Sequence, residues 1–175
     1  MTRPRRAVLA FGSNLAGPLS GPEEQIRVAA AALADRTGVT PVAASAMYAT
    51  APWGVTDQAE FRNSVLIVDT TLSPLELLHT GQTLEQDARR VRERHWGPRT
   101  LDIDLVHIKG ETSDTDELRL PHPWAHERAF VLVPWLDADP HAALSGRAVT
   151  EWLAELGPDA ATAGIRALPE VEWAP

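Results

Sequence analysis

The sequence predicts an α+β fold, a ferredoxin-like sandwich in which helices pack on an antiparallel sheet. Three observations lead to this prediction. Short apolar or alternating segments indicate four strands, two amphipathic segments with capping signals indicate helices, and the elements follow in the order βαββαβ. Because the chain has 175 residues, we expect one domain over 1–175, with a core at about 7–140 and a C-terminal extension at about 141–175.

The first half of the core begins with a buried strand at residues 7–11, AVLAF. The segment Ser20–Glu23 resembles a capping box with a proline near the first helical position, and apolar residues at helical spacing follow it. Gly38 lies beyond the predicted end of this helix. Residues 41–49 and the β-branched segment 61–69 indicate the next two strands.

The second half of the core begins with Ser73–Glu76, a second capping box, which predicts a helix as far as about residue 88. Residues 101–108 (LDIDLVHI) alternate with period two. This pattern predicts a strand whose odd-numbered apolar side chains face the core. Beyond the core, Thr150 is a candidate N-cap for a short helix, which a glycine and a proline at 157–158 would end.

The composition excludes several kinds of site. The chain has no cysteine, which rules out a disulfide framework, thiolate zinc sites, iron–sulfur clusters and cysteine nucleophiles. There is no apolar run long enough to span a membrane, and the apolar stretch near the N-terminus is too short for a signal peptide. We therefore expect a soluble, cytoplasmic protein that has no membrane partner and acts as a monomer.

The charge is acidic overall, but the cations are concentrated. The net charge is −8, whereas proteins that bind nucleic acids are usually basic. A sandwich of this kind could serve as a platform for RNA, but no aromatic RNP-like strand accompanies it, so we expect no nucleic-acid partner. Five of the 16 cationic side chains lie in the connection 89–100: Arg89, Arg90, Arg92, Arg94 and Arg99.

Two carboxylates, Asp102 and Asp104, directly follow these arginines. On a strand they would leave the same face, about 6–7 Å apart at the backbone. Two acids on one spot repel each other unless a cation joins them, and Mg²⁺ accepts one or two carboxylates together with water and phosphate oxygens. Taken alone, the pair could equally be two ordinary acids on a solvated face. The arginines favour the magnesium interpretation, because guanidinium groups bind phosphate oxygens in a planar, bidentate manner.

Acids and arginines together indicate a site for a metal–polyphosphate, with a solvated charged loop as the alternative. No P-loop or kinase glycine-rich signature is present. Gln82, Glu85 and Arg89 share one face of the helix that leads to the loop, where they could hold nucleotide groups or simply face solvent. His122, which lies between two prolines, and Arg128 could add phosphate contacts.

A second group of side chains suits a flat heterocycle. Phe61 and Asn63 lie on one face of a predicted strand, and Phe130 follows later in the chain. Two aromatic rings can sandwich a heterocycle while an amide reads its hydrogen-bonding edge. Alternatively, both phenylalanines belong to the core. Residues 12–14 (GSN), after the first strand, are interpreted as a plain turn.

Together these residues resemble the signature of the 6-hydroxymethyl-7,8-dihydropterin pyrophosphokinase family of folate biosynthesis. The most specific run is WGPRTLDID at 96–104. Further runs match in the family's order, over about residues 7–140: FGSNL at 11–15, DQ at 57–58 followed by Phe61 and Asn63, LPHP at 120–123, and ERAFVL at 127–132. His95, Arg89 and Arg62 depart from the family's pattern.

The resemblance implies a reaction. ATP would pass its β,γ-diphosphoryl group to the hydroxymethyl oxygen of the pterin and release AMP, with two Mg²⁺ ions held by Asp102 and Asp104. The ATP site would be lined by Gln82, Glu85, Arg92, Arg99, His122 and Arg128. Arg90 would belong to a mobile loop that seals the site, and together with Arg92 and the two acids it would serve catalysis.

The resemblance also implies a pterin pocket. The pterin would stack between Phe61 and Phe130 and be read by Asn63, while the loop that contains Thr50 and Trp53 would close the pocket through its backbone. A metal-dependent phosphohydrolase built on the same acids is the alternative enzyme class. It would release phosphate with water as the acceptor and would need no pterin.

Overall fold

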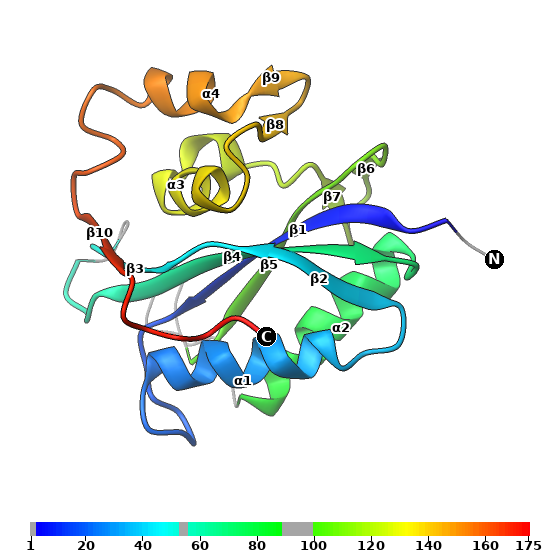
Figure 1. Ribbon diagram of the computed structural model, residues 1–175, viewed down its shortest axis with the longest axis horizontal. Helices are drawn as coiled ribbons and strands as arrows, with labels where there is room; N and C mark the ends of the chain where they lie inside the picture. Colours follow the sequence, from blue (N-terminus) through cyan, green and yellow to red (C-terminus); the bar gives the residue numbers. More distant parts are fainter. Residues whose placement is uncertain (1–2, 53–55, 89–99) are drawn as a thin grey trace.

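The computed structural model describes residues 3–52, 56–88 and 100–175. Its centre is an antiparallel sheet with helices on both faces (Figure 1). The strand order is β10-β3-β4-β1-β5, and β2 pairs with β4 on the same side as β3. The strands are β1 (Arg5–Ser13), β2 (Val39–Ala44), β3 (Met47–Thr50), β4 (Phe61–Thr70), β5 (Asp102–Ile108) and β10 (Ile165–Leu168).

The order of the core elements confirms the predicted ferredoxin-like α+β fold. β1 lies between β4 and β5 and pairs with β4 from Arg5, opposite Thr70, to Ser13, opposite Arg62. β1 is longer than the predicted strand at 7–11, since it continues through Ser13. This extension matters for the site because it carries Gly12 and Ser13 into the sheet.

The strand expected at 41–49 is in fact two strands, β2 and β3. Between them the chain leaves the regular ladder at Ser45, whose backbone N–H donates to the carbonyl of Val65 at 2.9 Å. The hydroxyl of Ser45 accepts from the backbone N–H of Val65 at 2.9 Å, so a side chain replaces a ladder bond. β2 therefore pairs with the second half of β4, and β3 pairs with the first.

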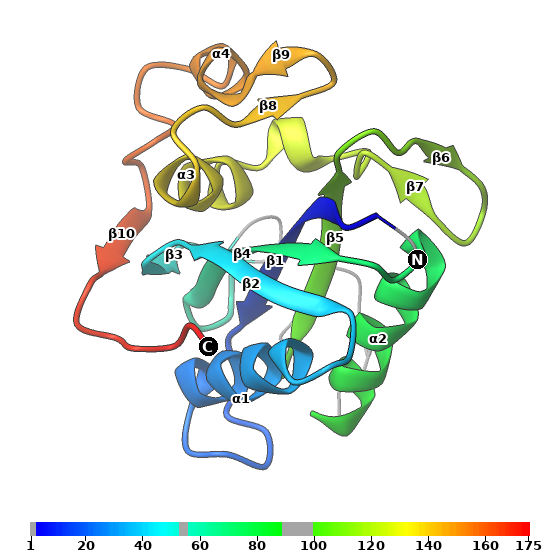
Figure 2. The same ribbon diagram turned by 45° about the vertical axis from the view of Figure 1, so that its right-hand side comes forward.

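Helices α1 (Pro22–Ala34) and α2 (Pro74–Asp87) cover one face of the sheet (Figures 1 and 2). The capping box predicted for α2 is confirmed: Glu76 N–H donates to Ser73 Oγ at 3.2 Å, and Ser73 N–H donates to Glu76 Oε2 at 2.7 Å. The capping box predicted for α1 is wrong. Its N-cap is Gly21, which has no side chain to bond the first turn, and only the proline at the start of α1 matches the expectation.

The other face is covered by α3 (Ala129–Ala138), on which α4 (Val149–Glu155) and the short 3-10 helix η1 (Ala125–Glu127) pack (Figure 2). Their buried side chains form a second core cluster with Val8, Val65 and Val106 of the sheet. The sequence predicted only the short helix of this layer. Its expected N-cap, Thr150, is wrong, because the helix begins at Val149 after Ala148.

Two small hairpins complete this side of the molecule: β6 (Ser113–Asp114) with β7 (Arg119–Leu120), and β8 (Ala143–Leu144) with β9 (Arg147–Ala148). The chain then returns to the sheet as β10, and its last residues pass to the α1 face, where Trp173 joins the first core cluster. Within the described ranges, no helix is both long and apolar enough to cross a membrane.

Candidate active site

The strand register gathers the predicted pterin and metal side chains on one face of the sheet. Gly12 of β1 lies opposite Asn63 of β4 on one side and opposite Asp102 of β5 on the other. An even number of residues further along each neighbouring strand, Val65 of β4 and Val106 of β5 point to the same face as Asn63 and Asp102. Both valines belong to the core cluster under α3. Asn63 and Asp102, and with them Phe61 and Asp104, therefore lie on the face that carries α3.

Gly12 is a point of close approach between the two groups of side chains. A Cβ atom at this position would lie 2.9 Å from Asn63 Oδ1 and 3.9 Å from Asp102 Cβ. The first distance is shorter than real Cβ contacts, so only glycine fits beside the amide. The interpretation of residues 12–14 as a plain turn is therefore wrong: Gly12 and Ser13 are strand residues that lie between the candidate subsites.

Asn63 is held in one orientation by its neighbour on β3. Its Nδ2 donates to Thr50 Oγ1 at 2.5 Å, and both side chains are buried. Thr50 itself lies opposite Phe61 in the β3–β4 pairing. Since Nδ2 is bonded to Thr50, Oδ1 is the amide atom that approaches Gly12. Thr50, Phe61 and Asn63, which the sequence separates, are thus adjacent in the sheet.

Asp104 lies next to two polar side chains from the segment before α3. Arg128 Nη1 donates to Asp104 Oδ2 at 3.1 Å, and His122 Nε2 lies 3.9 Å from Asp104 Oδ1. The Arg128 guanidinium also lies over the ring of Phe130, with its carbon 5.7 Å from the ring centre. Phe130 is half-buried in the first turn of α3. Arg128 therefore connects the carboxylate group to the aromatic group.

His122 is a partly buried, neutral imidazole. Burial, and after it the positive charge of Arg128, lower its pKa to about 4, against the opposing effect of Asp102. Its Nδ1 accepts from the backbone N–H of Trp124 at 3.2 Å. The proton of the neutral ring then lies on Nε2, the atom that faces Asp104. His122 can therefore donate a hydrogen bond to an anionic oxygen in front of the acids.

Glu85 of α2 supports the strand that carries the two acids. Its side chain is only 6% exposed, and Oε1 accepts from the backbone N–H of Ile103 at 2.8 Å. Ile103 lies between Asp102 and Asp104, so this bond fixes the strand at the candidate metal site. Gln82, one turn earlier on α2, is exposed.

Sequence reasoning missed two side chains, Ser13 and Asn14, whose hydrogen bonds join the end of β1 to the segments on either side of the site. Ser13 is fully buried, and its Oγ donates to the carbonyl of Thr100 at 2.5 Å. Asn14 Nδ2 donates to Gln58 Oε1 at 2.9 Å and to the carbonyl of Ala59 at 3.0 Å. Two signals could have found them: both lie in the FGSNL run that resembles the family's motif, and they directly follow a predicted buried strand, a pattern that turns share.

The remaining predicted residues cannot be placed in this geometry. Trp53, Arg90, Arg92 and Arg99 lie outside the described residues, as do the other arginines of the loop. Arg62, which departs from the family's pattern, donates to Glu23 at 2.6 Å. It alternates with Phe61 and Asn63 along β4 and so faces α1, away from the site.

The acids fit a magnesium site that is completed by a substrate. Both side chains are partly exposed on one face, and oxygen donors are those that Mg²⁺ prefers. In the part of the chain that the structure describes, no group of three or more acidic or histidine side chains gathers as a metal cage. Asp102 and Asp104 would therefore hold the ion together with phosphate oxygens and water.

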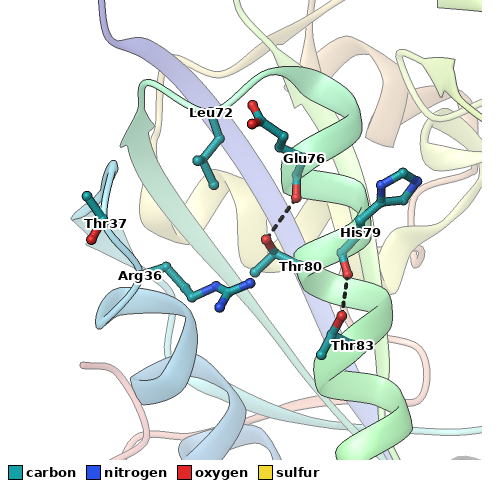
Figure 3. A pocket seen from close by; sticks show the side chains of 7 residues that line it. All are labelled: Arg36, Thr37, Leu72, Glu76, His79, Thr80 and Thr83. Atoms are coloured by element: carbon teal, nitrogen blue, oxygen red, sulfur yellow. Dashed lines mark hydrogen bonds between the residues drawn. The ribbon is translucent and has the colours of Figure 1, made fainter.

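Two hollows lie elsewhere on the molecule. One of about 420 Å³ lies between the end of α1 and the first turns of α2, where Arg36, Glu76 and His79 line it (Figure 3). Its threonines, Thr80 and Thr83, bond carbonyls of their own helix. The other, of about 790 Å³, lies at the opposite end of the sheet from Phe61, beside Asp69 and Lys109. Neither contains a residue predicted for the site.

The chain is similar to known proteins over most of its length. Residues 8–140 match the family model described as 7,8-dihydro-6-hydroxymethylpterin-pyrophosphokinase. A 2-amino-4-hydroxy-6-hydroxymethyldihydropteridine pyrophosphokinase of Methylorubrum extorquens is 43% identical over 156 residues, which cover 87% of this chain and 94% of that protein. The enzyme of the same name from Mycobacterium tuberculosis is 44% identical over 168 residues, covering 87% of this chain and 85% of that protein.

Solved structures show the same fold. A wild-type HPPK-DHPS of Plasmodium falciparum with pteroate superposes with a TM-score of 0.69 at 12% identity, covering 95% of this chain and 46% of that one. An HPPK-DHPS in complex with substrates gives a TM-score of 0.72 at 13% identity, covering 95% of this chain and 47% of that one. The family match and the identities to whole relatives decide the assignment: the chain belongs to the 7,8-dihydro-6-hydroxymethylpterin-pyrophosphokinase family.

Proposed function

We propose that the protein transfers the diphosphoryl group of ATP to the hydroxymethyl oxygen of 6-hydroxymethyl-7,8-dihydropterin, which gives AMP and the pterin diphosphate. One observation carries the proposal beyond family membership. Gly12 brings the amide of Asn63 and the carboxylate of Asp102 to its two sides on one face of the sheet. A heterocycle read by the amide would therefore present its substituent to a polyphosphate held at the acids.

In the proposed pterin subsite, Phe61 and Phe130 stack the ring and Asn63 reads its edge. The bond from Asn63 to Thr50 leaves the amide in a fixed orientation, which suits recognition of a heterocycle with alternating donors and acceptors. Trp53 and the backbone after Thr50 would close this subsite. A neutral, flat ring is stabilised by stacking and by a few hydrogen bonds, without need for a charge partner.

In the proposed nucleotide subsite, Asp102 and Asp104 would hold two Mg²⁺ ions, and cations and polar groups would line the ATP. We assign to this lining Gln82, Glu85, Arg92, Arg99, His122 and Arg128, with Arg90 closing over it. Bound Mg²⁺ supplies neutralisation of the charge that develops on the transferred phosphates. Arg128 and the Nε2–H of His122 would add donors to the same oxygens, in a setting where burial strengthens each bond.

The reaction then depends on position rather than on a strong base. The hydroxymethyl oxygen forms a bond to the β-phosphorus, and the bond from that phosphorus to the oxygen of AMP breaks in line. The hydroxyl proton is released to solvent, since the groups that could accept it are engaged. Asp102 and Asp104 are assigned to Mg²⁺. Glu85 accepts from the N–H of Ile103, and His122 already carries its proton on Nε2. Asn63 and the two rings would orient the hydroxymethyl group, and the guanidinium groups would hold the triphosphate in line with it.

A single assay tests the proposal. The purified protein is incubated with ATP, Mg²⁺ and the pterin, and the nucleotides are separated. AMP should form in step with a pterin diphosphate and only when both substrates are present. ADP or free phosphate formed without the pterin would instead support the phosphohydrolase alternative.

Removal of the Phe130 ring tests the pterin subsite. Phe130→Ala is expected to raise the dissociation constant of the pterin by about 10- to 100-fold, because a stacked ring contributes about 1–3 kcal/mol. Phe130→Tyr keeps the ring and should restore most of the affinity. Titration with the pterin and, separately, with a non-hydrolysable ATP analogue measures both effects. An unchanged pterin constant in Phe130→Ala would remove this residue from the subsite.

We also propose that residues 1–175 form one domain that works as a monomer in the cytoplasm. The segment after residue 140 supports the first point, because it adds β10 to the same sheet as the core strands. The lack of cysteine is consistent with a reducing compartment.

A further inference from the structure

The C-terminal segment returns to the strand that carries Thr50. β10 lies beside β3 at the edge of the sheet (Figure 2). The two strands pair antiparallel, with Ile165 opposite Thr50 and Leu168 opposite Met47. One bond continues this pairing beyond β3: Ala51 N–H donates to the carbonyl of Gly164 at 2.8 Å. Gly164 has a positive φ of 67°, and a Cβ there would lie 2.9 Å from Ala51 Cβ. The segment before β10 and the segment after β3 are therefore in close contact beside the proposed pterin subsite.

Trp173 anchors the same segment on the other side of the sheet. Its indole is 3% exposed, and Nε1 donates to the carbonyl of Ser45 at 2.9 Å. Its ring centre lies 5.9 Å from that of Phe11. Ser45 is the residue at which the edge of the sheet breaks between β2 and β3, so Trp173 fixes the point from which β3 begins.

β3 needs this support because it is short. It has four residues, and β4 pairs with only three of them, Tyr48 to Thr50. Without β10, β3 would be a four-residue strand at the edge of the sheet, with little stability of its own. The hydroxyl that orients the Asn63 amide belongs to its last residue, Thr50. The orientation of the amide therefore depends on a strand whose outer partner is β10.

We infer that β10 and Trp173 act as positioning elements for the pterin subsite, holding β3 so that Thr50 fixes the Asn63 amide. The inference rests on the proposed function for the identity of the ligand. The C-terminal extension thereby has a part in substrate recognition. Loss of the C-terminal extension should weaken pterin binding. Nucleotide binding should stay unchanged, because Asp102 and Asp104 lie on β5, which β1 separates from β4.

The test compares two indole-to-phenyl substitutions. Trp173→Phe keeps a ring beside Phe11 but removes the N–H that binds Ser45. Trp152→Phe is the matched control, since Trp152 of α4 also donates from Nε1 to a backbone carbonyl, that of Leu144 in β8, at 3.0 Å. β8 pairs with β9 and not with β3. Hydrogen exchange over residues 46–52, the dissociation constants of the pterin and of an ATP analogue, and the melting temperature are measured for each.

In Trp173→Phe we expect faster exchange over 46–52 and a pterin dissociation constant raised about 3- to 10-fold, the effect of one lost hydrogen bond. The constant for the ATP analogue should stay within about twofold. Trp152→Phe should lower the melting temperature similarly without either change. Deletion of residues 158–175 should reproduce the selective loss in a larger form, and Gly164→Ala should do so if the truncated chain fails to fold.

Two results would overturn the inference: equal losses of pterin affinity in Trp173→Phe and Trp152→Phe, or faster exchange over 46–52 with pterin affinity unchanged. Failure of the proposed function would look different. The parent protein would then bind no pterin, while exchange over 46–52 still depended on Trp173. That outcome would support the structural coupling and overturn the identity of the ligand.

Discussion

Replacement of Asp104 by alanine is expected to reduce turnover at least about 10³-fold while the protein stays folded, and Asp102→Ala should do the same. Each carboxylate is partly exposed on the sheet face and would hold Mg²⁺ together with phosphate oxygens. A loss of 10³-fold corresponds to about 4 kcal/mol of transition-state stabilisation. Removal of one of two neighbouring negative charges also relieves repulsion in the metal-free protein, so the fold should not suffer.

Asp104 needs an additional variant because it also accepts from Arg128. Asp104→Asn keeps the size of the side chain and an oxygen that can accept this bond, so it separates the loss of charge from the loss of the contact. Asp116→Ala, an exposed acid in the loop between β6 and β7, serves as the control. Turnover, binding of Mn²⁺ in the presence of the ATP analogue, and thermal unfolding are compared. Turnover within a few-fold of the parent in both alanine variants would refute the metal role.

The side chains that the sequence placed correctly on the fold lie on long, strongly patterned segments. Alternation from Leu101 to Ile108 predicted that Asp102 and Asp104 share a face, and the strand β5 has this arrangement. The capping box at Ser73 predicted the start of α2. The position of this helix lets Glu85 accept from the backbone N–H of Ile103, between the two acids. In both cases a local signal is enough, because alternation and capping depend on residues only a few positions apart.

The contacts that the sequence could not predict join segments far apart in the chain. Gly12 looked like part of a turn because its function, close approach to Asn63, is visible only when β1 and β4 are paired. Trp173 showed no pattern, and its partner Ser45 lies 128 residues away. The layer over the second face begins where a Pro- and His-rich segment gives no periodic signal. Register and long-range packing decide such contacts, and a single sequence carries little information on either.

Gly12→Ala is expected to lower kcat/KM for the pterin about 10²-fold while the affinity for an ATP analogue changes little, because a displacement of about 1 Å can cost that much. The new methyl would meet Asn63 Oδ1 at 2.9 Å, and the amide cannot turn away freely because its Nδ2 is bonded to Thr50. Asp102 Cβ, at 3.9 Å, is in ordinary contact and should not move. The substitution should therefore impair the pterin subsite and leave the nucleotide subsite unchanged.

A matched glycine and a double-mutant cycle separate this cause from a general loss of stability. Gly21→Ala is the control, since Gly21 is extended, with φ −177°, and an added Cβ would meet only the carboxylate end of Glu23, at 3.2 Å. Asn63→Ala removes the atom that the new methyl would strike. The double variant Gly12→Ala/Asn63→Ala should then be no worse than Asn63→Ala alone, because the clash has lost its second partner. Full additivity of the two losses would show that Gly12 acts on the pterin subsite through something other than the Asn63 amide.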